Sequence, residues 1–158
     1  MSTEKNWISY RAVVSYQGTY FDGWQSQPHK KTIQDTIESA LYKLFSCKQK
    51  IIGASRTDAG VHAFGQVFTF LAPIQISEEK LINLLNNNLI DTIYIRTIEK
   101  TSENFHPRFQ AKKKIYQYCI SEKKNEPREK FFYLLFRVRT RHKFFSTIIE
   151  LIHWNLQF

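Results

Sequence analysis

The chain has 158 residues, the length of a single domain, and its aromatic share of 15% excludes a disordered chain, because disordered segments contain few aromatic residues. Lysine and arginine number 23 against 14 acidic residues, which gives a formal net charge of +9. This excess favours a polyanionic partner, with nucleic acid ahead of a membrane surface. The alternative is a positive charge that only aids solubility.

Cysteine usage and the lack of long apolar runs predict a cytoplasmic protein. Cys47 and Cys119 form neither a CxxC pair nor a zinc-ligand spacing, so we expect free thiols in a reducing compartment and no metal site. Residues 1–7 contain no apolar stretch typical of a signal peptide. The apolar run at 131–136 is too short for a membrane span, which takes about 20 residues.

The first predicted element is a strand at residues 7–17, which is rich in β-branched and aromatic residues. A loop follows at 18–31, where two glycines and one proline disfavour a regular helix or strand. From Thr32 the apolar residues recur at helical spacing, with Thr32 as the N-cap and Asp35 in a variant of the capping box. A short strand is expected at 50–55.

Four further elements are predicted between residues 64 and 121. A strand at 64–72 ends at a proline, and a helix at 78–88 begins after Ser77, which we expect to cap it. The residues that turn inward from this helix are Leu81, Leu84 and Leu85. Strands are expected at 91–99 and, after a loop, at 113–121.

The order β-α-β-β-α-β predicts an α+β fold of the ferredoxin-like kind, a split β-α-β unit as in RNA-recognition motifs. Its antiparallel sheet would carry the helices on one face, with one extra strand. Beyond Glu122 the composition changes: residues 122–130 are a charged linker and residues 131–145 alternate aromatic and basic side chains. Residues 146–158 could form a short amphipathic helix. Residues 129–158 as a whole resemble what a frameshift might leave, or could equally be a divergent strand and helix. We therefore divide the chain into a domain at 1–121 and a divergent or aberrant tail at 122–158.

The connection between the second and third strands brings acidic and basic residues together among small ones. Arg56, Asp58 and His62 lie close to several small residues, with glycine, alanine and serine at 53–55 and alanine and glycine at 59–60. One interpretation is an ordinary turn in which Arg56 and Asp58 pair with each other, with a structural histidine. The other is a site. An arginine beside a carboxylate lowers its pKa and keeps it ionised, and an ionised carboxylate can act as a nucleophile or a base.

A second group of basic and aromatic residues lies between positions 105 and 118. Its members are Arg108, Lys112, Lys113, Lys114, Phe105, Phe109, Tyr116 and Tyr118. Cations hold phosphates and aromatic rings stack on bases, which suits an RNA-binding surface. The alternative places the aromatics in the core, and we favour it for Phe109 and Tyr118. Tyr116 and Tyr118 share one face of a strand, so the pattern does not decide which tyrosine meets a ligand.

Several colinear segments match the elements of a known family. The segments "GASRTDAGVHAFGQVFTF" (53–70) and "YQGTYFDGWQSQP" (16–28) resemble the signature, roughly GxGRTDxGVHAxGQ, and the YDGxxxxGWQxQ element of the tRNA pseudouridine synthase A family. "NFHPRFQAKKKIYQY" (104–118) resembles DFHARFxAxxxxYxY, "TIQDTIESAL" (32–41) resembles the SVQExLExAL helix of that family, and "NNNLIDTIYIR" (86–96) resembles its NxxLPxDI element. The likeness covers about residues 8–121, which makes 1–121 the N-terminal domain with the catalytic motif.

The resemblance implies an isomerase that converts uridine to pseudouridine in the anticodon stem-loop of tRNA, at positions 38 to 40, without cofactor or metal. It assigns Asp58 as the catalytic carboxylate and Tyr116 as the residue that stacks on the target base. It assigns Arg56 to moving the base out of the stack and to pairing with Asp58. Whether Asp58 attacks the sugar, attacks the base or abstracts a proton stays open. Further substrate-binding residues expected from it and from the basic segment are Gly60, His62, Gln25, Arg108, Lys112, Lys113 and Lys114.

The resemblance also shows where this chain departs from the family. Gln17, Ser55 and Ile90 replace an aspartate, a glycine and a proline that are usual there. Family chains are longer, form homodimers, and carry a second half that completes the cleft with a basic and an apolar residue. Relative to that two-subdomain fold, we interpret this chain as truncated. The alternative to an active enzyme is therefore an impaired remnant that binds tRNA without turnover.

Overall fold

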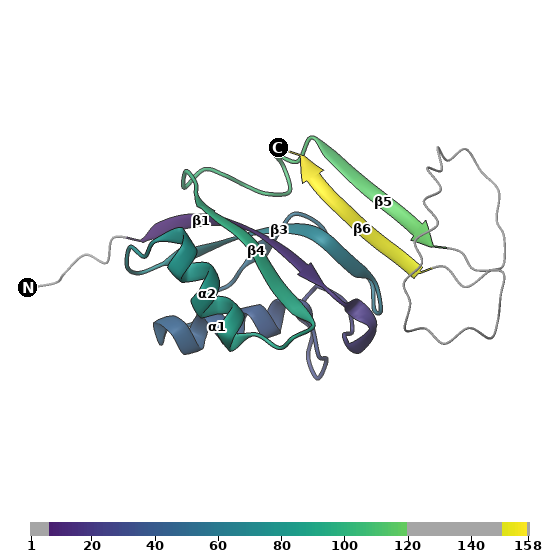
Figure 1. Ribbon diagram of the computed structural model, residues 1–158, viewed down its shortest axis with the longest axis horizontal. Coiled ribbons are helices and arrows are strands. Elements are labelled where there is room, and N and C mark those ends of the chain that lie inside the picture. The colour runs from purple at the N-terminus through teal and green to yellow at the C-terminus, as the bar shows by residue number, and fades with distance from the viewer. Residues whose placement is uncertain (1–6, 120–149, 158) are drawn as a thin grey trace, which may run out of the picture.

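Six strands and two helices form the part of the protein that the computed structural model describes, residues 7–119 and 150–157 (Figure 1). The strands are β1 (Ile8–Tyr16), β2 (Ile52–Gly53), β3 (His62–Ala72), β4 (Ile93–Lys100), β5 (Lys113–Cys119) and β6 (Glu150–Gln157). The helices are α1 (Ile33–Phe45) and α2 (Glu78–Asn88), and a single 3-10 turn, η1, spans Gly18–Tyr20. No helix within these two ranges is long and apolar enough to cross a bilayer.

β1 is the central strand of the antiparallel part of the sheet. It pairs with β3 on one side and β4 on the other, so that Ala12 lies opposite both Phe68 and Ile98. β2 pairs antiparallel with the far side of β3, where Ile52 faces Thr69. The strand order β4-β1-β3-β2 and the chain order of these elements confirm a small α+β unit with a four-stranded antiparallel sheet and two helices.

Both helices lie on one face of the sheet and enclose the core (Figure 1). Alternate residues of β1 point to this face and are buried, and the ring of Tyr10 stacks on that of Phe70 with centroids 5.5 Å apart. Ile37, Leu41, Leu81 and Leu85 meet them from the helices, all with no exposed surface. Burial of each such side chain stabilises the fold by about 1.5–3 kcal/mol. Leu84, predicted to turn inward, is only half-buried.

The two helix starts differ in their caps. The amide of Asp35 donates to the Thr32 hydroxyl over 3.2 Å, and that hydroxyl donates to the Asp35 carboxylate, which confirms the predicted N-cap of α1. Ser77 occupies the N-cap position of α2, but its side chain makes no capping hydrogen bond. The predicted N-cap position of Ser77 is therefore confirmed, but the predicted capping by its side chain is wrong. The first turn instead carries Glu78, whose carboxylate favours a helix N-terminus and accepts from the Lys100 amide over 3.1 Å.

The sheet continues past β3 through two strands that extend the antiparallel unit. β6 pairs with the start of β3 in parallel, His62 opposite Ile152, and with β5 in antiparallel register, Tyr116 opposite His153. The short helix considered for residues 146–158 is therefore wrong for 150–157. A helix of that length is marginal alone, whereas a strand at this position gains ladder hydrogen bonds on both sides. The predicted linker at 122–130 and the segment at 131–145 lie outside the described residues.

Candidate functional site

The connection between β2 and β3 alternates buried and exposed residues. Ser55 and Thr57 are buried, whereas Arg56, Asp58 and Gly60 are exposed. The hydroxyl of Thr57 lies 2.9 Å from that of Tyr16, and burial raises the pKa of this tyrosine although the hydrogen bond to Thr57 opposes the shift. The fold thus holds Thr57 in place and leaves the side chains of its two neighbours, Arg56 and Asp58, on the surface.

The segment that contains η1 holds this connection in place through close backbone approach. The amide of Trp24 donates to the Thr57 carbonyl over 3.0 Å. A Cβ at Gly23, which has φ +97°, would lie 2.6 Å from that same carbonyl oxygen. A Cβ at Gly18 would lie 1.9 Å from the Val61 carbonyl oxygen. Side chains at either glycine would therefore push the connection away from the sheet.

A tight turn follows the exposed carboxylate of Asp58. The amide of Val61 donates to the Asp58 carbonyl over 3.2 Å, and Gly60 has φ +80° at the third turn position, the value that type II turns require. No atom lies within 4 Å of a Cβ built on Gly60. The structure thus gives Gly60 a conformational role, and its contact with substrate stays a prediction.

Gln66 anchors the start of the connection from within β3. It is fully buried, and its Nε2 donates to the Ser55 carbonyl over 2.7 Å while the Ser55 hydroxyl donates to Oε1 over 3.2 Å. Tyr16, Thr57 and Gln66 were not predicted as parts of the candidate site. The available signal was a polar residue inside an otherwise apolar strand, since buried polar groups need partners.

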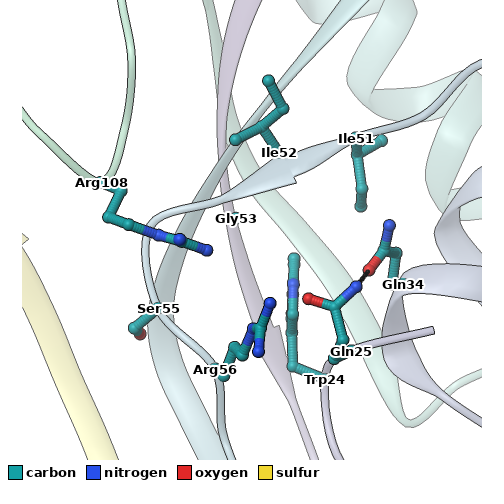
Figure 2. Close-up of a pocket in the computed structure, with 9 residues that line it drawn as sticks. All are labelled: Trp24, Gln25, Gln34, Ile51, Ile52, Gly53, Ser55, Arg56 and Arg108. Carbon is teal, nitrogen blue, oxygen red and sulfur yellow. Dashed lines mark hydrogen bonds between the residues drawn. The ribbon is translucent and has the colours of Figure 1, made fainter. Parts of the chain in front are cut away.

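The predicted pairing of Arg56 with Asp58 is absent. Within residues 7–119 and 150–157, neither side chain takes part in an ion pair. Arg56 turns instead toward the indole of Trp24, as Figure 2 shows. His62 is the first residue of β3 and is nearly buried, with its Nε2 3.4 Å from the Thr19 hydroxyl. In the described part of the chain, no three side chains of the metal-ligating kinds gather into a possible metal site.

A pocket of about 100 Å³ brings three of the predicted residues together, namely Gln25, Arg56 and Arg108. Gln25 comes from the loop before α1, Arg56 from the β2–β3 connection and Arg108 from the loop between β4 and β5 (Figure 2). The side-chain Nε2 of Gln25 donates to Oε1 of Gln34 over 2.8 Å. The remaining described residues of the lining are Trp24, Gln34, Ile51, Ile52, Gly53 and Ser55.

The aromatic and basic segment lies partly as predicted. Tyr116 is half-exposed in β5 and aligns, through one residue of β6, with Ala63 of β3, two strand spacings or about 10 Å away. Lys112, Lys113 and Lys114 are exposed. The core position favoured for Phe109 is wrong: its side chain is 80% exposed and its ring stacks on His106 with centroids 4.3 Å apart. The side chain of Tyr118 lies outside the described residues.

Comparison with known proteins assigns this arrangement to a family. A family model described as tRNA pseudouridine synthase matches residues 12–110, more than half of the chain. The tRNA pseudouridine synthase A of Phytoplasma mali is 48% identical over 118 residues, which cover 74% of this chain and 48% of that protein. The protein of the same name from Pseudothermotoga lettingae is 45% identical over 111 residues, 70% of this chain and 45% of that protein. The chain thus spans about half the length of the curated relatives it matches, and it belongs to the tRNA pseudouridine synthase family.

Proposed function

We propose that the protein converts uridine to pseudouridine in tRNA, with Asp58 as the catalytic carboxylate. The observation that carries this proposal is the contrast within three residues of the β2–β3 connection. The Thr57 side chain is buried against Tyr16, while the Asp58 carboxylate next to it reaches solvent. A reactive group needs such a mount, because it must meet a substrate while its backbone stays fixed.

The reaction is an isomerisation, so it needs no second substrate. The bond between N1 of the base and the sugar breaks, the base rotates, and its C5 joins the sugar carbon. The C5 proton leaves and N1 gains one, so atoms balance. Asp58 would act as a nucleophile or as a base. Both roles require a carboxylate that reaches the ribose or the base, and the exposure of Asp58 supports either.

The proposed substrate region is the anticodon stem-loop, at positions 38 to 40 of the tRNA. A base within a stem must leave the stack, at a cost of a few kcal/mol. The half-exposed ring of Tyr116 would stack on the extruded base, and Arg56 would enter the vacated space. The net charge of +9 and the exposed lysines at 112–114 support contact with the RNA backbone.

The organisation of the chain follows from the same proposal. The strand order β4-β1-β3-β2 with both helices on one face supports a ferredoxin-like domain at residues 1–121, and we place the tail at 122–158. A tRNA substrate implies a cytoplasmic site of action. The resemblance to the family further predicts a homodimer, which sedimentation of the purified chain would test.

A second candidate function is tRNA binding without turnover. It is supported by the exposed lysines at 112–114, which suit contact with an RNA backbone whether or not the chain turns the RNA over. The two candidates share the basic surface and differ only in the chemistry at Asp58.

Release of tritium from tRNA that carries [5-³H]uridine separates the candidates, because the C5 hydrogen leaves only on isomerisation. We expect turnover by the wild-type chain, none by Asp58→Asn or Asp58→Ala, and wild-type turnover by Asp91→Asn. Asp91 is an exposed aspartate before β4 and serves as the matched control. Turnover by Asp58→Asn would refute the assignment. A wild-type chain that binds tRNA but releases no tritium would establish the second candidate.

A further inference from the structure

We propose that Arg56 and Arg108 together hold a single backbone phosphate of the bound RNA, in the pocket between the β2–β3 connection and the β4–β5 loop. This inference rests on the proposed function in one respect, that the partner is an RNA. It adds a phosphate site that does not include the catalytic carboxylate, because Asp58 is not among the residues that line the pocket.

Both guanidinium groups face the same small space although they come from distant segments (Figure 2). The tight turn at residues 106–110 aims Arg108. The amides of Phe109 and Gln110 both donate to the His106 carbonyl over 3.1 Å. The Arg108 amide itself donates to Nδ1 of His106 over 3.3 Å. Arg108 therefore projects from a hydrogen-bonded turn rather than from an extended loop.

The charge in the pocket is uncompensated. Neither Arg56 nor Arg108 takes part in an ion pair within the described residues, and none of the described lining residues is acidic. The nearby carboxylate of Glu38 is engaged behind the lining, where its Oε1 accepts from the Gln34 side chain over 2.8 Å and from the Ile51 amide over 3.0 Å. Two unneutralised guanidinium groups in one concavity attract an anion.

The size and chemistry of the pocket fit a small oxyanion, and RNA supplies one as its backbone phosphate. Its volume of about 100 Å³ is well below the roughly 300–1,000 Å³ of pockets that enclose a whole small molecule, so a nucleoside does not fit. The planar guanidinium donates two parallel hydrogen bonds to phosphate oxygens. The hydrogen bond between Gln25 and Gln34 holds the polar wall of the pocket in one arrangement. A phosphodiester can enter such a pocket while its sugars and bases stay outside.

The site would act as an anchor beside the reaction centre. Arg56 lies two residues before Asp58 on the same hydrogen-bonded connection. A phosphate held by Arg56 and Arg108 would therefore fix the RNA strand relative to the carboxylate before any base leaves the stack. This gives Arg56 a role in ground-state binding in addition to the one expected from the family resemblance.

The test measures tRNA binding by the full chain in an Asp58→Asn background, so that no chemistry contributes. Affinity is followed by fluorescence anisotropy across a series of salt concentrations, for Arg56→Gln, Arg108→Gln and the double variant. Each phosphate contact contributes about 0.7–0.9 to the slope of log affinity against log salt. We expect the double variant to reduce the slope by about that amount in total, and each single variant by no more than that, since one phosphate is shared. Lys80→Gln, an exposed charge on α2, should leave the slope unchanged.

Two results would overturn the proposal while the proposed function survives: tRNA binding with an unchanged slope in the double variant, or a loss in the double variant of about twice the contribution of one phosphate, which would mean two separate phosphates. Absence of tRNA binding by the chain would overturn both. A second measurement titrates inorganic phosphate and follows the side-chain NMR signals of the two arginines. We expect both to shift with a common affinity. Shifts with phosphate but an unchanged slope with tRNA would identify a site for free phosphate and refute the RNA assignment.

Discussion

The hydroxyl groups of Tyr16 and Thr57 lie 2.9 Å apart in a buried contact that joins the central strand to the β2–β3 connection. Thr57 stands between Arg56 and Asp58, the two exposed residues with proposed roles in substrate binding and chemistry. The contact with Tyr16 therefore positions the backbone from which the side chains of Arg56 and Asp58 project. This contact ties the candidate site to the hydrophobic core, to which Tyr16 belongs.

Tyr16→Phe should destabilise the protein by about 1–3 kcal/mol, because it leaves the Thr57 hydroxyl buried without its hydrogen-bond partner. The phenyl ring keeps the packing against Trp24, whose ring centroid lies 5.9 Å from that of Tyr16. Urea unfolding followed by tryptophan fluorescence measures the change. Turnover should fall more than tRNA affinity, since the connection moves but the basic surface stays.

A double-mutant cycle with Thr57→Val attributes the loss to this pair. Removing both hydroxyl groups leaves no unsatisfied partner, so the double variant should be less destabilised than the sum of the single changes. Strict additivity would mean that the two hydroxyl groups do not interact in solution.

Stability should decline at alkaline pH in a way that depends on Tyr16. Burial raises the pKa of this tyrosine in the folded protein, so its neutral form is favoured by folding. The associated stability is fully present below about pH 10, the pKa of an unfolded tyrosine, and decreases as the pH rises above it, by at most about 1.4 kcal/mol per pH unit. Urea unfolding between pH 8 and pH 11 should show a steeper decline for wild type than for Tyr16→Phe. Tyr20→Phe, which changes an exposed tyrosine, is the control and should keep the wild-type dependence of stability on pH. An equal decline of stability with pH in wild type and Tyr16→Phe would contradict a raised pKa at Tyr16.

Two glycine substitutions separate backbone strain from steric conflict. Gly60→Ala meets no atom within 4 Å and should cost only the strain of its φ of +80°, about 1–2 kcal/mol. Gly23→Ala adds a conflict with the Thr57 carbonyl at 2.6 Å to a similar strain, and should cost more and shift the site. Urea unfolding of both variants gives the order. Equal losses of stability in the two variants would show that the β2–β3 connection moves easily to accommodate a side chain at position 23.

Two substitutions of Tyr116 distinguish base stacking by its ring from hydrogen bonding by its hydroxyl. Tyr116→Phe keeps an aromatic ring and should retain tRNA affinity within a few-fold, whereas Tyr116→Ala removes base stacking worth about 1–3 kcal/mol. Binding to tRNA and turnover are measured for both. Because the ring is half-exposed, neither change should destabilise the fold strongly. Unaltered binding and turnover in Tyr116→Ala would exclude this tyrosine from the site.

Neutralising the exposed lysines at 112–114 with glutamine should weaken tRNA binding at low salt. The salt slope should fall by about one for each lysine that contacts a phosphate. The matched control changes three exposed lysines on the helix side, Lys43, Lys48 and Lys80, and should leave the slope as in wild type. Equal effects of the two triple variants would indicate charge attraction without a defined surface.

Much of the fold could be predicted because local patterns fix it. The helical spacing from Ile33 and the alternation in β1 and β4 gave elements within one or two residues of those observed. Other features depend on neighbours. The predicted strand at 50–55 is reduced to two residues, and β3 begins at His62, earlier than predicted, since pairing with β6 extends it. The strand at 150–157 was missed because its partners are distant in sequence.

The family and the residues of the candidate site can be read from the amino-acid sequence: an arginine, an aspartate and small residues in one connection, followed by a basic and aromatic segment. Only the tertiary structure decided which of these side chains meet. It leaves Arg56 without an ion pair to Asp58, lines one pocket with Arg56 and Arg108, and places the Tyr16 hydroxyl beside that of Thr57. Such contacts join residues far apart in the chain, and their geometry follows from strand register and backbone approach at Gly18 and Gly23, which no local pattern encodes.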